Sequence, residues 1–552
     1  MTALSQLSRR RFLSLTSVGL GGSILLRGSA LAAEPVTAQV ATGTLRGFRD
    51  QGALAFLGVP YADTTAGENR FKAPQPFPAW EGKRDAIAYG PLAPQIPSTL
   101  GKDDPTFEWY YQKDPLGEDC LVLNVFTPDL NPDARRPVMF YIHGGGYVNG
   151  GGGGAGLDGA NLANFGDVVV VTINHRLNAF GFTDLSPYGE EYADSANAGM
   201  LDIIAALEWV RDNIVAFGGD AGNVTLFGQS GGGSKIMILL GMPGAEGLFH
   251  RAISMSGAAG LNIDPAADMQ PYVEALLAEL NVTQDNIDAI QDVSIDEVLA
   301  ARGRAVAASL EGARPVIDGR HITTSAMTPE GMTRHANVPL MFGHTHTEAT
   351  LFFRSDMRNF DLTEDQMRAR IRQAFGIDDA RIDAIMAAYR ADAPDMTPSD
   401  ILIAVASDVQ FRLPLTRAAE TRSATKGQAP VWLYDFAWAI PQDNGVLGSP
   451  HAVDIPFAFG TVDAAGAMVG PGDGPRKAAL NMMSAFVNFA RHGDPNNDRM
   501  PEWVPFDAET RTTMRIDAEC EPMRDFRAAA NAEIADLQID PFNRAALYAY
   551  QE

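Results

Sequence analysis

The stretch VTLFGQSGG, residues 224–232, decides the fold of this chain. An apolar run ends at Phe227, and Ser230 follows between glycines at positions 228 and 232. A serine on so sharp a turn has strained backbone geometry, and side chains two residues away on either side would collide there, so glycine is required. Residues 232–240 can then start a helix. The stretch therefore predicts a strand, a tight turn that exposes Ser230, and a helix, which is how a nucleophile is presented.

Apolar runs typical of strands recur along the chain, with helical patterns between them. The runs are residues 138–142, 168–173, 224–227, 338–342 and 431–436. They are nearly continuous rather than alternating, which suits a parallel sheet covered on both faces. The clearest helical pattern covers residues 200–214, and residues 266–334 and 361–424 are interpreted as mostly helical insertions. The chain is thus predicted to be α/β, with a large, mostly parallel central sheet flanked by helices.

A second glycine-rich segment, HGGGY at residues 143–147, directly follows the run that ends at Ile142. Glycines at the end of a strand allow backbone N–H groups to approach a substrate closely. We expect Gly145 and Gly146 to donate to a substrate oxyanion, together with the N–H of Gly231 after the serine. The alternative is a flexible loop, because glycines continue to residue 154.

Two other glycine patterns fail as cofactor motifs. Residues 151–156 contain G-x-G-x-x-G, but the strand ended at Ile142 and no tight strand-to-helix turn is present. Residues 228–235 resemble a phosphate loop, but Lys235 does not directly follow the glycine. We therefore expect no cofactor.

These motifs together resemble the type B carboxylesterases, a branch of the α/β-hydrolases that includes bacterial nitrobenzyl-type esterases and cholinesterases. The segments that carry the resemblance are FLGVPYA (56–62), RF (70–71), EDCLVLNV (118–125), NHRL (174–177), FGGDAGNVT (217–225) and GDPN (493–496). The resemblance covers essentially the whole chain after the first 32 residues. It implies an α/β-hydrolase fold with helical insertions and the hydrolysis of a small ester substrate.

The resemblance also implies the partners of Ser230, in the chain order serine, acid, histidine. PLMFGHTHTE (339–348) matches the segment that ends in the catalytic glutamate, so Glu348 is the expected acid. GSPHAVDIPF (448–457) matches the histidine segment, so His451 is the expected base. The chain departs from the family at Thr347, where aspartate is usual, and at Ala349, where glycine is usual.

The implied reaction is acyl transfer through Ser230, without a metal or organic cofactor. The same triad can act on amides, thioesters or lactones. A binding protein of the same fold is a more distant alternative, but such members lack a triad residue that this chain retains. His344 and His346 could suggest a metal pair, but no third ligand is visible and we expect no metal. Candidates for lining the substrate pocket, or for core packing, are Tyr147, Trp109, Tyr110, Tyr111 and Phe352.

Two further departures from the family are informative. A family disulfide normally joins a cysteine that matches Cys120 to a position that is Ala93 here, so we expect Cys120 to be a buried free thiol. The residue before the nucleophile is often glutamate but is Gln229 here. The loss of this negative charge argues against a site for a choline-type cation.

The first residues are interpreted as an export signal rather than as part of the fold. SRRRFL (8–13) matches the twin-arginine pattern, and ALA (30–32) offers a cleavage site. We therefore expect a signal peptide over residues 1–32, a single catalytic domain over residues 33–552, and a periplasmic or secreted bacterial protein.

Composition sets the remaining limits. The chain has 552 residues, of which 46% are hydrophobic and 20% charged, and a net charge of −25. A protein with this negative charge is repelled by nucleic acid and by anionic membrane surfaces, so we expect neither as a partner. No apolar run reaches the roughly 18 residues of a membrane span. The two cysteines cannot form a disulfide framework or a zinc site by themselves. Composition does not specify the oligomeric state.

Overall fold

The computed structural model describes residues 35–98, 102, 104–538 and 547–548, and within them the chain forms a 13-stranded sheet. The expected export signal lies outside these residues. The strands are β1 (Val36–Val40), β2 (Gly43–Asp50), β3 (Ala53–Pro60), β4 (Lys83–Asp85), β5 (Val122–Thr127), β6 (Arg136–Ile142), β7 (Val169–Ile173), β8 (Gly219–Gln229), β9 (Arg251–Met255), β10 (Leu340–Thr345), β11 (Val431–Phe436), β12 (Thr513–Ile516) and β13 (Glu521–Met523).

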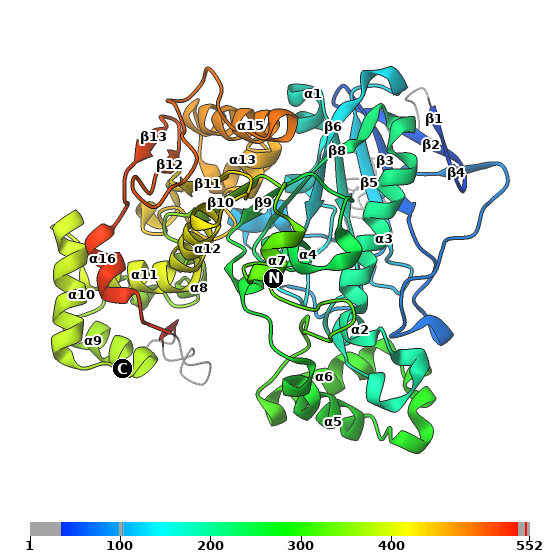
Figure 1. Ribbon diagram of the computed structural model, residues 1–552, viewed down its shortest axis with the longest axis horizontal. Helices are drawn as coiled ribbons and strands as arrows, with labels where there is room; N and C mark the ends of the chain where they lie inside the picture. The colour runs from blue at the N-terminus through cyan, green and yellow to red at the C-terminus, as the bar shows by residue number, and fades with distance from the viewer. Residues whose placement is uncertain (1–34, 99–101, 103, 539–546, 549–552) are drawn as a thin grey trace, which may run out of the picture.

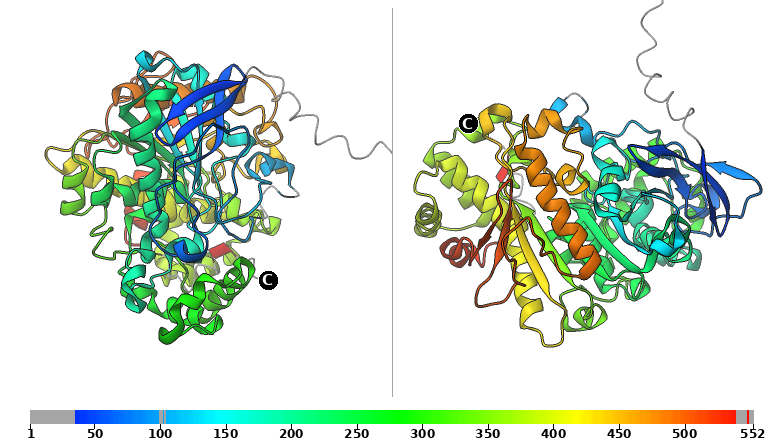
Figure 2. Two further views of the ribbon diagram at one scale, coloured as in Figure 1. Left: turned by 90° about the vertical axis from the view of Figure 1, so that its right-hand side faces the viewer. Right: turned by 90° about the horizontal axis from the view of Figure 1, so that it is seen from above.

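The centre of the sheet is parallel, and its edges are antiparallel except for the short strand β4. The strand order is β1-β2-β3-β5-β7-β6-β8-β9-β10-β11-β12-β13, with β4 paired to β2. The strands from β7 to β12 in this order run parallel, and Figure 2 shows them fanning out with the twist of an open sheet. Because the carboxyl ends of parallel strands meet at one edge, the loops after β6, β8, β10 and β11 lie on the same side of the sheet.

Helices cover both faces of this sheet. They are α1 (Ala160–Gly166), α2 (Asn178–Phe182), α3 (Ala198–Asn213), α4 (Gly231–Gly241), α5 (Gln270–Glu279), α6 (Ile295–Ser309), α7 (Pro329–Arg334), α8 (Thr350–Phe353), α9 (Glu364–Phe375), α10 (Asp379–Asp392), α11 (Pro398–Ser407), α12 (Leu413–Ala424), α13 (Ile455–Phe459), α14 (Gly466–Val469), α15 (Gly474–His492) and α16 (Ala528–Ile534). Helices α1, α13 and α15 share one hydrophobic cluster, and α3, α4 and α12 contribute to another across the sheet.

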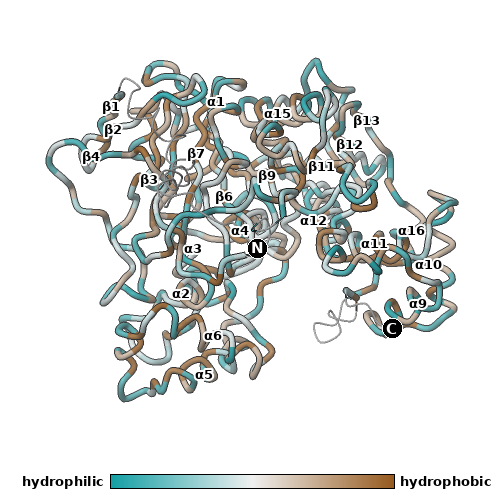
Figure 3. Tube along the Cα trace, turned by 180° about the vertical axis from the view of Figure 1, so that it is seen from behind, coloured by the Kyte–Doolittle hydropathy of each residue, from teal (hydrophilic) through white to brown (hydrophobic). Residues whose placement is uncertain are grey.

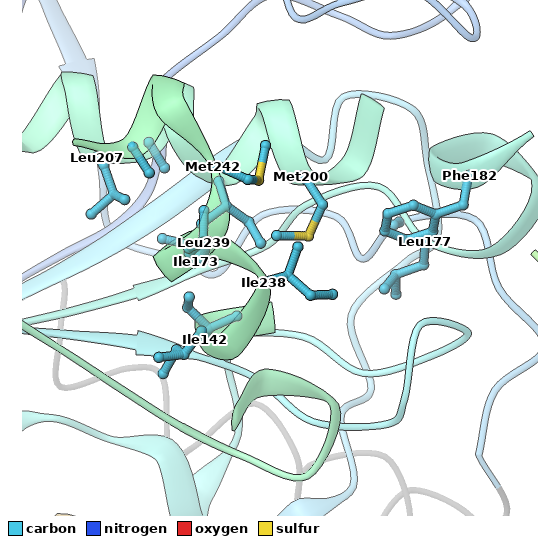
Figure 4. Packing of buried hydrophobic residues seen from close by; sticks show 14 of the residues in the cluster. Ile142, Ile173, Leu177, Phe182, Met200, Leu207, Ile238, Leu239 and Met242 are labelled. Atoms are coloured by element: carbon cyan, nitrogen blue, oxygen red, sulfur yellow. The ribbon is translucent and has the colours of Figure 1, made fainter. Parts of the chain in front are cut away.

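The two clusters explain why the central strands are apolar throughout. In β6, Val138, Phe140 and Ile142 belong to one cluster, whereas Met139 and Tyr141 belong to the other. Figure 4 shows part of the first cluster, in which side chains of α3 and α4 pack above β6 and β7. Hydrophilic stretches lie on peripheral segments such as α9 (Figure 3). The expected α/β class and the covered parallel sheet are confirmed.

The expected elements match the observed ones with small shifts in their ends. The run expected at 338–342 begins as a strand at Leu340, because Pro339 has no N–H group for the ladder, and continues to Thr345. The two expected insertions contain α5 to α7 and α9 to α12 (Figure 1). Helices α9 to α11 of the second insertion share a hydrophobic cluster with α8 and α16. Within the described residues, no helix is long and apolar enough to cross a membrane.

Candidate active site

Ser230 occupies the turn between β8 and α4 in the strained geometry expected from its neighbours. Its backbone has φ 56° and ψ −123°, a region that residues with a side chain rarely adopt. Its N–H donates to the carbonyl of Met255 at 2.8 Å, which ties the turn to β9. The side chain is half-buried, whereas its neighbours on both sides are buried. The turn therefore presents the hydroxyl group of Ser230 at the carboxyl edge of the sheet.

The glycines around Ser230 are required by close backbone contacts. A Cβ atom at Gly228 would lie 2.6 Å from the carbonyl oxygen of Ile142. A Cβ at Gly232 would overlap that same oxygen, since the first turn of α4 lies directly against the end of β6. The expectation that side chains two residues either side of the serine would collide is confirmed.

The segment 143–147 lies beside this turn because β6 and β8 are neighbours. Ile142 pairs with Gly228 in the ladder, so the residues after each strand emerge side by side. Gly145 and Gly146 have φ 89° and 62°, which only glycine adopts readily. A Cβ at Gly231 would overlap the carbonyl of Gly146. The three glycines expected to form an oxyanion hole are thus brought together, and none of their N–H groups donates to another described residue.

His451 and Glu348 meet although they come from different loops. Glu348 follows β10, and His451 lies in the loop after β11. The His451 Nδ1 atom is 2.5 Å from Glu348 Oε2, and the N–H of His451 donates to the carbonyl of Glu348 at 3.3 Å. The other carboxylate oxygen, Oε1, accepts from Ser256 Oγ at 2.6 Å and from the N–H of Thr345 at 2.9 Å. The carboxylate is therefore fully hydrogen-bonded and fixes the orientation of the imidazole.

The surroundings of Glu348 favour its ionised form in spite of complete burial. Burial opposes ionisation, but the His451 imidazole and the hydrogen bonds from Ser256 and Thr345 outweigh it and lower the pKa of Glu348 below its ordinary value. An ionised carboxylate at Nδ1 places the proton of a neutral imidazole on that nitrogen. The Nε2 atom is then left as the proton acceptor.

In this structure the amide of Gln229, rather than Ser230, contacts the outer nitrogen of the imidazole. The Gln229 Nε2 atom is 3.2 Å from His451 Nε2 and 3.5 Å from Nδ1. Among the described residues, no hydrogen bond joins Ser230 Oγ to His451. The Gln229 side chain is only 1% exposed. This side chain therefore faces the imidazole rather than solvent.

Asp454, the other carboxylate near His451, has a different partner. Its Oδ2 atom accepts from the hydroxyl of Tyr434 at 3.2 Å. Burial and the negative charge of Glu348 raise the pKa of Asp454 to about 7. The geometry thus assigns the contact with His451 Nδ1 to Glu348.

Two phenylalanine rings lie against His451. Phe352, which the sequence proposed as a pocket residue, lies 5.4 Å from the imidazole between ring centroids. Phe411 lies 4.9 Å away and stacks on Phe352. Phe411 belongs to a π-helical turn, Asp408–Arg412, in which Asp408 accepts from Arg412 at 2.7 Å and from Arg527 at 2.8 Å. The site therefore has an aromatic wall held by buried charges.

The other pocket candidates divide between a cavity and the core. Tyr110 and Tyr111 line a cavity beside Asn149, close to the glycine loop. Trp109 is 2% exposed and belongs to a hydrophobic cluster, so it packs in the core. Tyr147 packs edge-on against Phe182.

Sequence reasoning missed Ser256, Phe411 and the contact of Gln229 with His451. Ser256 follows β9, a five-residue strand that was not among the expected runs. Its backbone has φ 54°, similar to that of Ser230, and a serine at a strand end was the available signal. Phe411 lies in an insertion more than 60 residues from Glu348 in the sequence, and no local pattern points to it.

The remaining candidate residues have structural partners. His346 Nδ1 lies 3.0 Å from Asp435 Oδ2, and His344 Nδ1 lies 3.2 Å from the carbonyl oxygen of Thr345. No group of three or more potential metal ligands is assembled in the described part of the chain. Cys120 is a buried free thiol, as expected, and burial raises its pKa well above the ordinary value.

Comparisons with known proteins agree with this architecture. The model of the carboxylesterase family matches residues 34–535. The para-nitrobenzyl esterase of Bacillus subtilis is 34% identical over 498 residues, which cover 88% of this chain and 96% of that protein. The phenmedipham hydrolase of Pseudarthrobacter oxydans is 32% identical, with 91% of this chain and 99% of that protein covered. The crystal structure of the Geobacillus stearothermophilus carboxylesterase EST55 has a TM-score of 0.77 at 32% identity, and the match covers 90% of this chain and 99% of that one.

Proposed function

The chain belongs to the carboxylesterase family and is a carboxylic ester hydrolase of the α/β-hydrolase fold, and we propose that Ser230, His451 and Glu348 carry out the hydrolysis. The observation that carries the proposal is the imidazole of His451, held 2.5 Å from the buried carboxylate of Glu348 beside the strained turn of Ser230. A nucleophile, a base and a group that orients the base are the three parts that acyl transfer needs.

In the proposed reaction, Ser230 Oγ attacks the ester carbonyl carbon while its proton passes to His451 Nε2. The N–H groups of Gly145, Gly146 and Gly231 hold the negative oxygen of the tetrahedral intermediate. The bond to the alcohol oxygen breaks, and His451 returns the proton to that oxygen, which leaves the acyl group on Ser230. Water then attacks the acyl carbon by the same route, so the carboxylic acid leaves and the serine is restored.

This reaction requires the His451 Nε2 atom to exchange one partner for another. In the free enzyme that atom faces the Gln229 amide, and in the reaction it accepts the proton of Ser230. Catalytic hydrogen bonds are often long in unliganded sites and tighten when the substrate binds. We infer that substrate binding brings the serine and the imidazole together.

The aromatic wall supports an uncharged ester as the substrate. Phe352 and Phe411 offer apolar rings next to His451, and Gln229 adds no negative charge beside the serine. A series of p-nitrophenyl esters of increasing chain length should show kcat/KM rising with apolar acyl length until the pocket is filled. The matching anilides and thioesters measure how far the same site acts on amides and thioesters.

Labelling of the serine tests the triad directly. A fluorophosphonate should attach to Ser230 and to no other serine, as read by mass spectrometry of the peptides. Ser230→Ala should abolish labelling and lower kcat by roughly 10⁴–10⁶-fold with the fold retained. Ser309→Ala, in which the lost hydroxyl bonds only to backbone groups of Ala305 and Glu311 around the end of α6, is the matched control. Full activity of Ser230→Ala would exclude this serine as the nucleophile.

We also propose that residues 1–32 direct export by the twin-arginine route and that residues 33–552 form the mature catalytic domain. The arginine pair is the part of such a signal that the export machinery reads. Replacing Arg9 and Arg10 by lysine should therefore retain the precursor in the cytoplasm. Terminal sequencing of exported wild-type protein should begin at or near Ala33, and an intact Met1 on that protein would contradict the proposal.

A further inference from the structure

Lys235 is a buried cation that the proposed reaction does not use. It lies in α4, five residues after Ser230, and its side chain is completely buried. Within the described residues, no carboxylate forms an ion pair with it. The next turn of α4 packs through Ile238 and Leu239 into the apolar cluster shown in Figure 4. Burying an ammonium group without a carboxylate is costly, so its remaining partners are informative.

Those partners are the two carbonyl groups that flank the glycine loop. The Lys235 Nζ atom donates to the carbonyl of Gly146 at 2.9 Å and, at the longer distance of 3.4 Å, to that of His143. The peptide units between these two carbonyls carry the N–H groups of Gly145 and Gly146. One ammonium group therefore holds both ends of the segment that supplies two of the three oxyanion donors.

A loop of consecutive glycines needs such a restraint more than other loops do. Glycine loses more conformational freedom on ordering than any other residue. Oxyanion donors act well only when they are already aimed at the position of the developing charge. The carbonyl of Gly145 is held by the N–H groups of Val148 and Asn149, both at 3.2 Å, which leaves the outer carbonyls of His143 and Gly146 to Lys235.

We propose that Lys235 is a positioning residue for ester hydrolysis, whose ammonium group ties the glycine loop to the helix that carries Ser230 and Gly231. The proposal rests on the proposed function, because it assumes that the N–H groups of this loop bind the oxyanion. Lys235 acts through the backbone of the loop and does not contact the substrate.

The ionisable groups around Lys235 do not change charge near neutral pH. Burial, and then the charge of Lys235, lower the pKa of His143 to about 3, and burial lowers that of His175 well below its ordinary value. Burial raises the pKa of Tyr147, whose ring lies 5.7 Å from Nζ, to about 12. Further out, Arg176 is paired with Asp202, and Arg314 with Asp264. Burial lowers the pKa of Lys235 itself to about 7.

The first experiment compares Lys235→Met with the wild-type enzyme. Methionine fills a similar volume but donates no hydrogen bond. We expect kcat for a p-nitrophenyl ester to fall about 10–100-fold, as for a small misplacement of catalytic groups, while KM changes less than about threefold. The affinity for a trifluoromethyl ketone, which forms a tetrahedral adduct with the serine, should fall by the same factor as kcat/KM. Lys477→Met, which removes an exposed lysine paired with Glu519, is the matched control.

A second readout tests whether the Lys235 amine is buried in the folded state. Because the folded pKa of Lys235 lies below its unfolded value, the unfolded state binds more protons between about pH 7 and 10.5. The stability of the wild type relative to Lys235→Met should therefore rise across that range, as measured by urea unfolding at pH 7 and pH 10. A stability difference that does not depend on pH would mean that the pKa of Lys235 is the same in the folded and unfolded states, and would contradict the burial of its amine beside the glycine loop.

The outcomes distinguish the inference from the proposed function. If Ser230→Ala is inactive while Lys235→Met keeps kcat within threefold of wild type, the inference is wrong and the triad stands. If Ser230→Ala is active, the proposed function itself is wrong. Lys235→Gln, which keeps an N–H donor, is the second variant, with a kcat expected between those of wild type and Lys235→Met. If neither variant folds while Lys477→Met does, Lys235 serves stability and the inference is overturned.

Discussion

Two buried carboxylates beside His451 differ in their protonation at neutral pH. Glu348 receives hydrogen bonds from His451, Ser256 and Thr345, and its pKa is lowered, whereas the pKa of Asp454 is raised to about 7. Environments that separate the pKa values of neighbouring acids often mark different roles in one site. Here the ionised acid contacts the imidazole, and the acid that resists ionisation contacts the hydroxyl of Tyr434.

Matched amide variants test this difference. Glu348→Gln should lower kcat by roughly 10³–10⁴-fold, because the amide cannot stabilise the imidazolium or hold the correct tautomer. Asp454→Asn should lower kcat by less than about tenfold, because it resembles the protonated acid that is already populated at pH 7. Steady-state rates at pH 7 give both values. A larger loss in Asp454→Asn than in Glu348→Gln would mean that the acid is misassigned.

The contact between Gln229 and His451 gives the residue before the nucleophile a defined position. From the sequence, this glutamine was interpreted as a missing negative charge next to the serine. In the structure the Gln229 amide is buried and faces the imidazole, so Gln229 contacts the base His451 directly rather than the substrate.

At the scale of elements, the position of the serine depends on how closely α4 approaches β6. The first turn of the helix contacts the last carbonyl of the strand, and the glycines at 228 and 232 make this approach possible. The same approach brings the loop after β6 next to Gly231. The candidate active site is therefore a consequence of packing between one helix and one strand.

Two glycine-to-alanine variants test this packing, and they are expected to change the free energy of unfolding in opposite directions. Gly232→Ala should lower the free energy of unfolding by about 3 kcal/mol or more, because its Cβ would overlap the carbonyl of Ile142. Gly303→Ala lies inside α6 with open space around its Cβ, and it should stabilise the protein by about 0.5–1 kcal/mol. Urea unfolding measures both. An unchanged midpoint in Gly232→Ala would contradict the close contact between α4 and β6.

At the scale of the whole molecule, buried charges connect the parallel strands. Asp435 is completely buried in β11, and in the ladder it lies between His344 of β10 and Arg515 of β12. Its carboxylate lies 3.3 Å from Arg515 Nε and 3.0 Å from His346 Nδ1. Burial opposes its ionisation, but His346, His344 and Arg515 outweigh it and lower the pKa of Asp435 far below its ordinary value.

The Asp435 carboxylate should make the free energy of unfolding depend on pH in the acidic range. A group whose folded pKa is lowered contributes stability above its unfolded pKa, about 4, and loses it as the pH falls toward the folded pKa. Asp435→Asn should therefore cost about 3 kcal/mol at pH 7, as for a broken buried ion pair, and progressively less below pH 4. Urea unfolding between pH 7 and pH 2 measures the difference. Asp85→Asn, in an exposed pair with Arg46, should leave the unfolding curve nearly unchanged at every pH.

Local patterns were sufficient for five strands, β6, β7, β8, β10 and β11, and for the order of the motifs along the chain. The strained turn at Ser230, the glycines that it needs, the apolar strands and the glycine loop follow from steric and hydrophobic rules that act within a few residues. The family resemblance then supplied Glu348 and His451 as partners. It also supplied the expectation that Cys120 is a free thiol, because the family's partner position for a disulfide is Ala93 here.

Only the tertiary structure decided which segments meet at the site. The sheet order places β6 beside β8 and β10 beside β11, and this order brings Glu348 to His451 across 103 residues of sequence. The bond from Ser256, the ring of Phe411 and the carbonyl partners of Lys235 likewise depend on contacts between distant segments. Such contacts result from the packing of whole elements against one another, so a local pattern of residues cannot predict them.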